Sequence, residues 1–287
     1  MAKWRDTAWK RVLCAGAQSA IDYLMPDLAA DMDSEGEINS VSGVELFSDA
    51  SDSNKYMRET DVFFNIPMLD RKNGNVVMFT EQQHDPNSDL PERVFETFIR
   101  MREKWRQRTT CIVIYTGSAP NVNTYTESCY GFKVAVEFKT YYLPEKTADE
   151  LKADHHPFAL VMLAARLSLD AEGNKDLREK YAMEILETIE KRSYDEEKKF
   201  FILKFAERIF QLSKPDVSEK VRKVYKMQMV PIKEYAHKVE LECERQEGAE
   251  ERAFEIARSL LAGGMPPQEV ARHTELSIED LQYLMPH

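Results

Sequence analysis

Three polar side chains stand at the ends of two apolar segments that are typical of paired β-strands. Asp61 opens the segment 62–66, while Glu81 and Gln83 follow the segment 76–79. Side chains on a strand alternate between its two faces, so Glu81 and Gln83 are expected to point the same way. If the two segments pair as a hairpin, two carboxylates and an amide gather at one edge of a sheet. Such a cluster suits a hard divalent cation such as Mg²⁺ and a phosphodiester substrate.

Composition limits the other function classes. The chain has 287 residues, of which 43% are hydrophobic, enough for one large domain with a helical appendage. Its net charge of -11 is unusual for a nucleic-acid binder, so a nuclease would need its basic residues segregated on one face. The 4 cysteines form no CxxC pair, which argues against a zinc site or disulfides and favours a reducing, cytoplasmic location. No segment is apolar enough to cross a bilayer, so we expect no membrane partner.

The first half of the chain mixes strand and helix signals. Residues 1–25 have helical spacing that ends at Pro26, and residues 27–54 are acidic and Ser-rich, which indicates a loop leading to a short ordered element at 41–47. Beyond the hairpin, the pattern predicts a helix over 90–106 begun by Pro91, a buried strand over 111–116 and a half-exposed strand over 132–138.

The second half is predicted to be helical. Apolar spacing of three or four indicates helices over 158–169, 175–191, 195–212 and 217–227, then a long charged helix over 231–251. The tail, 252–287, predicts a helix-turn-helix-like unit in which Gly263-Gly264 ends one helix and Pro266-Pro267 begins the next. We therefore expect an α/β core over 1–145, a helical region over 146–251 and this small tail.

The ordered set of motifs resembles a known family. In chain order it comprises Glu45-Leu46, Arg58-Glu59-Thr60-Asp61, the Gly74 turn, Glu81-Gln82-Gln83, the helix start Pro91-Glu92-Arg93 and the strand 112–117. The set is similar to that of the Rpn family of recombination-promoting nucleases and transposases, a branch of the PD-(D/E)XK phosphodiesterase superfamily in which Gln replaces the terminal Lys. The 24–28 helix exit and the 256–277 tail also resemble that family.

The resemblance implies a fold, a cofactor and site residues. The fold would be a mixed sheet flanked by helices. Asp61 and Glu81 would ligate Mg²⁺, with Mn²⁺ as a substitute, and the backbone carbonyl of Gln82 would be a third ligand. Gln83 would orient the attacking water in place of the lysine, and Glu45 would match a helix carboxylate that joins the metal site in relatives. A neutral amide lacks the positive charge of lysine, so slower or more metal-dependent cleavage is expected.

Basic residues near the motif are the candidate nucleic-acid contacts. Arg58 and Arg93 could neutralise site carboxylates, contact phosphate or form ordinary ion pairs. Arg100 and Lys104 belong to a stretch, 93–108, with a local excess of cations, which indicates either a backbone-binding surface or a solvated helix.

The sequence leaves three function classes open. The first is a magnesium-dependent DNA endonuclease linked to recombination or mobile elements. The second is a nuclease-fold interaction protein with weak or no activity, which the acidic charge and the glutamine favour. The third makes the tail a DNA-binding or self-association module. A homodimer would suit cutting of both DNA strands, although no residue shows one.

Overall fold

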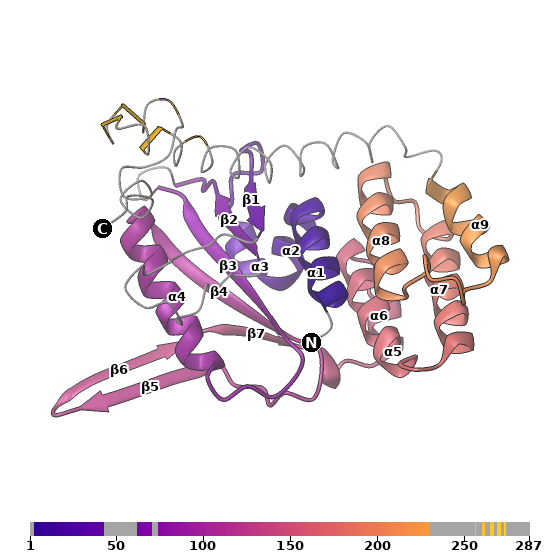
Figure 1. Ribbon diagram of the computed structural model, residues 1–287, viewed down its shortest axis with the longest axis horizontal. Helices are drawn as coiled ribbons and strands as arrows, with labels where there is room; N and C mark the ends of the chain where they lie inside the picture. The colour runs from indigo at the N-terminus through magenta and orange to yellow at the C-terminus, as the bar shows by residue number, and fades with distance from the viewer. Residues whose placement is uncertain are drawn as a thin grey trace. The chain divides into compact units, whose positions relative to one another are not determined.

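The computed structural model describes residues 3–42, 62–70 and 74–229, together with the tail positions 256, 260, 261, 265, 266, 269, 270 and 273. The chain divides into two compact units: Met1–Leu46 with Glu59–Tyr235, and Phe47–Arg58 with Ala236–His287. The helices and strands labelled in Figure 1 belong to the first unit, whereas the tail positions belong to the second.

A mixed five-stranded sheet forms the centre of the first unit (Figure 1). Its spatial order is β1 (Asn39–Ser42), β2 (Val62–Ile66), β3 (Val76–Gln83), β4 (Arg108–Tyr115) and β7 (Lys139–Tyr142). The pairs β1–β2 and β2–β3 are antiparallel, whereas β3–β4 and β4–β7 are parallel. The predicted α/β class, a mixed sheet flanked by helices, is confirmed at this level.

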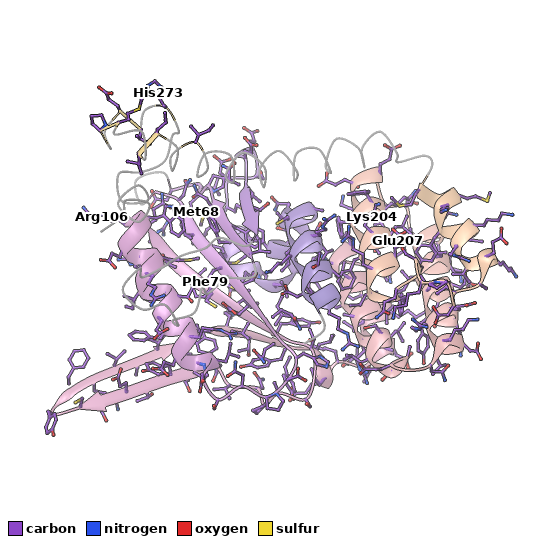
Figure 2. The ribbon with its side chains drawn as sticks, in the orientation of Figure 1. Met68, Phe79, Arg106, Lys204, Glu207 and His273 are labelled. Atoms are coloured by element: carbon purple, nitrogen blue, oxygen red, sulfur yellow. The ribbon has the colours of Figure 1, made fainter. Side chains whose placement is uncertain are left out.

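The hairpin expected from the two apolar segments is present. Val62 lies opposite Thr80 and Ile66 opposite Val76 in the β2–β3 pair. β3 is buried from Val76 to Gln82, as expected of a central strand, and Phe79, labelled in Figure 2, is fully buried. The polar end of β3 therefore lies inside the protein, where each charged or amide group needs a partner.

The helix predicted over 90–106 is present as α4 (Leu90–Trp105), and it makes the crossover from β3 to its parallel neighbour β4. Pro91 lies in its first turn, and the helix ends at Arg106, which adopts the left-handed conformation at φ 50° (Figure 2). The ring of Trp105 lies 5.0 Å from that of Phe63 on β2. Because Phe63 is paired with Phe79, the face of β3 that carries Phe79, Glu81 and Gln83 is the face toward α4.

The amino-terminal prediction is wrong in two respects. Instead of one helix, the chain forms α1 (Lys3–Ala15) and α2 (Ala17–Leu24), which meet at Gly16. A Cβ atom at Gly16 would lie 3.1 Å from the Phe201 ring, so a larger residue would be crowded at the point where the two helices meet. The expected loop contains a short helix, α3 (Pro26–Ala30), and strand β1. Of the ordered element predicted at 41–47, the part beyond residue 42 lies outside the described residues.

A separate two-stranded hairpin follows β4 (Figure 1). It consists of β5 (Thr124–Cys129) and β6 (Phe132–Glu137), so the predicted half-exposed strand is confirmed. The chain leaves β6 at Phe138, which is buried and donates its N–H to the Asn123 carbonyl oxygen at 2.9 Å, and it then enters β7.

Helices complete the unit after a short 3₁₀ turn, η2 (Leu143–Glu145). They are α5 (Ala148–Ala153), α6 (Pro157–Asp170), α7 (Lys175–Glu190), α8 (Glu196–Ile209) and α9 (Glu219–Met229). The last four are the four helices that hydrophobic spacing predicts. Helix α8 packs on α1 and α6, and the Trp9 and Phe205 rings meet edge to face at 5.0 Å. Within the described residues, no helix combines the length and apolarity needed to cross a membrane.

The described tail positions agree with the first turn expected there. Met265 donates its N–H to the Leu260 carbonyl oxygen at 3.0 Å, a spacing typical of a helix C-terminal cap. Val270 donates to Pro266 at 3.1 Å, which is helical spacing, and its side chain is buried. The long helix predicted over 231–251 and the second turn of the tail lie outside the described residues.

Candidate functional site

Glu81 is a buried acid in the central strand. The residue is 4% exposed and its side chain faces α4. Burial raises the pKa of the Glu81 carboxyl, because a carboxylate loses solvation inside the protein, while the positive charges of Arg93 and Lys10 act in the opposite direction. The balance favours the protonated form more than in water. A further cation at this carboxylate would favour ionisation.

Arg93 joins the two site residues of β3. It lies in the first turns of α4, and its Nη2 donates to Oε2 of Glu81 at 3.0 Å and contacts Oε1 of Gln83 at 3.5 Å. The Arg93 guanidinium is thus shared between the Glu81 carboxylate and the Gln83 amide. These two side chains lie on the same face of β3, as the sequence predicts. Of the roles left open for Arg93, the structure places it as the partner of a site carboxylate.

The Gln83 amide is held in one orientation. Its oxygen faces Arg93, and its Nε2 donates to the backbone oxygen of Asp85, just beyond the strand. The preceding residue, Gln82, points to the other face of the sheet, where it is buried and donates to Thr116 Oγ1. The Glu81–Gln83 pair therefore presents an acceptor and an oriented amide side by side.

The direction of the Gln82 carbonyl group follows from the hydrogen bonds between β3 and β4. Thr116 donates its N–H to the Gln83 oxygen at 2.9 Å, so that oxygen points toward β4. Carbonyl directions alternate along a strand, and the Gln82 oxygen therefore points toward the β2 side. The β2–β3 ladder, in the part of the chain described, ends at the pair Val62–Thr80, before Gln82. The backbone oxygen expected to assist a metal thus points toward β2, the strand that Asp61 precedes in the sequence.

The end of β3 packs tightly against the loop after β4. His84 Nδ1 lies 3.4 Å from Thr116 Oγ1, and its Nε2 lies 3.5 Å from Nη1 of Arg5, which also forms an ion pair with Glu172 at 3.1 Å. Burial and the charge of Arg5 lower the His84 pKa, which favours the neutral imidazole. A Cβ at Gly117 would overlap the backbone oxygen of His84, so only glycine fits there without a shift. The chain bends at Asp85, directly after His84 at the end of β3.

Two charged residues near the site were missed by sequence reasoning. Lys10 and Asp6, one turn apart on α1, form an ion pair at 3.3 Å, and both charges act on Glu81. Lys10 lowers the Glu81 pKa and Asp6 raises it. Their spacing of four predicts a shared helix face, which was a usable signal, but nothing local to α1 indicates that β3 lies near it.

Three predicted site residues, Asp61, Glu45 and Arg58, lie outside the described residues. The described neighbour of Asp61 is Val62, which is paired with Thr80, the residue before Glu81. Among the described residues, no group of three or more His, Cys, Asp and Glu side chains is arranged to hold a metal ion.

The candidate phosphate contacts lie along α4. Arg100 is half-buried two turns after Arg93, and Lys104 is one turn further along the helix. Arg102 is exposed and its Nη1 donates to the Gln107 oxygen at 2.7 Å, at the end of the helix. The predicted basic stretch, 93–108, is helical as far as Trp105, and its first member, Arg93, contacts Glu81. Its last member, Arg108, already belongs to β4.

Comparison of the chain with protein-family models, with curated proteins and with solved structures finds no match.

Proposed function

We propose that this chain is a magnesium-dependent DNA endonuclease with the arrangement of the PD-(D/E)XK nucleases, as its resemblance to the Rpn family implies. Asp61 and Glu81 are the proposed metal ligands, assisted by the Gln82 carbonyl oxygen and by Glu45. The observation that carries the proposal is the buried Glu81 carboxylate, which shares Arg93 with Gln83 at the end of β3.

The donor set fits a hard cation. Mg²⁺ prefers carboxylate and carbonyl oxygens, and Glu81 is a buried carboxylate whose pKa is raised, so an added positive charge would stabilise its ionised form. The Gln82 oxygen faces the side of the sheet where β2 begins, and Asp61 directly precedes that strand. When bound, the metal supplies charge neutralisation at the scissile phosphate and lowers the pKa of a coordinated water.

The residues of the chain have separable tasks in this proposal. Glu81 and Asp61 provide negative charge for the cation. Arg93 holds the Glu81 carboxylate in place and fixes the Gln83 amide. Gln83 orients the attacking water by hydrogen bonding, but it brings no net charge to a transition state in which negative charge builds up. We therefore expect slow cleavage.

Partners follow from the same proposal. The substrate is DNA, and Arg58, Arg100 and Lys104 are the proposed backbone contacts, which position a duplex without reading its sequence. Mn²⁺ would replace Mg²⁺ because both accept oxygen ligands. A role in recombination or mobile elements is proposed from the family resemblance alone.

Nicking of supercoiled plasmid by the full chain tests the proposal. Mg²⁺-dependent nicking is expected from the wild type and its loss from Asp61→Asn and Glu81→Gln, which change charge with little change in shape. Glu92→Gln is the matched control, because Glu92 is an exposed acid on α4 beside Arg93. Nicking that survives both site substitutions, or that needs no divalent cation, would contradict the proposal.

A non-catalytic interaction protein is the second candidate. It is favoured by the Arg93–Glu81 ion pair, which already neutralises the buried carboxylate, and by the net charge of -11. In that case the ion pair holds α4 on the sheet and no divalent cation is needed. Besides DNA nicking, a second measurement separates the two candidates: only the nuclease is expected to gain stability from Mg²⁺ through Glu81.

A further inference from the structure

The β5–β6 hairpin has a free edge that is complementary to itself. The two strands form their own sheet, and no third strand of the described residues pairs with them. Tyr130 and Gly131 make the two-residue turn, both at positive φ (43° and 90°), which is typical of a type I′ hairpin. Tyr130 at the tip is 106% exposed and Phe132 is 66% exposed.

The hydrogen-bond pattern defines which groups lie on that edge. Phe138 donates its N–H to the oxygen of Asn123. Backbone groups alternate in direction along a strand, so the N–H and C=O groups of Val136 and Val134 on β6 also point toward β5. The N–H and C=O groups of Lys133, Ala135 and Glu137 therefore point away from β5. These three side chains are exposed.

A second β6 strand fits this edge in antiparallel register centred on Ala135. Ala135 then pairs with its own copy, and Lys133 lies opposite Glu137 of the other chain in both halves of the interface. Both kinds of pair fall at hydrogen-bonded positions, so the free N–H and C=O groups on each side are satisfied. Val134 lies directly opposite Val136 of the other chain at a closely spaced position, on the opposite face from the charges.

The outer edge of β5 lacks this complementarity. Its corresponding residues are Thr124, Thr126 and Ser128, which carry no charge, and the position between the last two is Glu127. The β6 edge combines opposite charges with an apolar strip, as an isologous interface requires.

We propose that two copies of this chain associate through β6, which forms a four-stranded sheet across a two-fold axis. Pairing places Phe132, Val134 and Val136 of both chains on one face of that sheet. Tyr125 lies on the same face and stacks on Phe95 of α4 at 5.0 Å and 19°, which anchors the base of the hairpin to the body. A lone two-stranded hairpin is marginally stable in water, so pairing also stabilises the arm. This proposal does not depend on the nuclease activity.

Sedimentation equilibrium of the full chain, over about a hundredfold range of concentration, tests the proposal. We expect a reversible monomer–dimer equilibrium for the wild type. Lys133→Glu places two acids opposite each other and is expected to raise the dissociation constant about tenfold, while Lys133→Glu combined with Glu137→Lys restores it. Both positions are exposed, so neither change threatens the fold.

Proline variants test whether the dimer forms through the free edge of β6 or through that of β5. Ala135→Pro removes an outward N–H from β6 and is expected to abolish the dimer, whereas Thr126→Pro removes the outward N–H of the directly opposite residue on β5 and is expected to leave it intact. Circular dichroism checks that both variants fold. A wild type that stays monomeric, a double charge reversal that restores nothing, or equal loss in the two proline variants would overturn the proposal.

Discussion

Arg93 Nη2 lies 3.0 Å from Glu81 Oε2, and this ion pair ties the first turns of α4 to the buried end of β3. The Glu81 side chain is 6% exposed and the Arg93 side chain 27% exposed, so water screens the pair only partly. The same nitrogen contacts Gln83, so the geometry of the candidate site depends on one arginine side chain.

Arg93→Met should destabilise the protein, increasingly as pH rises. The Glu81 pKa is already raised, so the stability linked to it is greatest below the ordinary pKa of glutamate and is lost as pH rises through the folded-state value. Removing Arg93 raises that pKa further. We expect a loss of about 2 kcal/mol near neutral pH and a smaller loss in acid, measured by urea unfolding. Arg102→Met, on the exposed side of α4, is the control, and an equal loss at all pH values would refute the coupling.

Glu81→Gln should remove the stabilisation by Mg²⁺. In the wild type, a saturating divalent cation at about a hundred times its dissociation constant adds about 2.7 kcal/mol to the free energy of unfolding. The variant keeps the shape of the side chain but has no charge to bind the cation, and it also loses the pH dependence that comes from the raised Glu81 pKa. Thermal unfolding with and without Mg²⁺ measures this. The same rise in Tm for both proteins would exclude Glu81 as a ligand.

Gln83→Lys should increase the rate of DNA cleavage, because a positive charge beside the attacking water stabilises the transition state. The new ammonium group would also lie near Arg93 and compete for Glu81. Single-turnover nicking by the variant, by the wild type and by Gln83→Ala separates the effects. Equal rates for the lysine variant and the wild type would contradict the role assigned to Gln83.

Gly117→Ala should destabilise the site by about 1–3 kcal/mol, because the added Cβ would overlap the backbone oxygen of His84. Backbone cannot move aside as a flexible side chain can. Ser118→Ala, at the exposed next position, is the control and should change little. Unfolding free energies from urea titration give both values, and a neutral Gly117→Ala would show that the β3 and β4 ends are not held together there.

Local patterns predicted the elements near the site well. The β2–β3 pair, α4 and β4 each carry a strong local signal: apolar strands beside a polar turn, a proline helix start, and a β-branched run. The alternation rule also placed Glu81 and Gln83 on one face, and Arg93 on α4 faces them.

What the sequence did not show depends on distant contacts. The close approach of Phe201 to Gly16 joins residues that are far apart in the sequence, and the charges of Asp6 and Lys10 reach Glu81 only because α1 packs near the sheet. The polar strand β5 has no buried face, so it has no hydrophobic alternation to detect. The sequence also did not predict that β6 ends and β7 begins around Phe138, because the chain is extended on both sides of this residue.

The central claim is that Asp61 and Glu81 share one divalent cation. A crystal of the full chain soaked in Mn²⁺ tests it through the anomalous difference density of the metal. We predict one peak roughly 2.1 Å from an oxygen of each carboxylate and near the Gln82 carbonyl oxygen. A crystal structure in which the two carboxylates lie too far apart to reach the same ion, with no peak at Glu81, would contradict it.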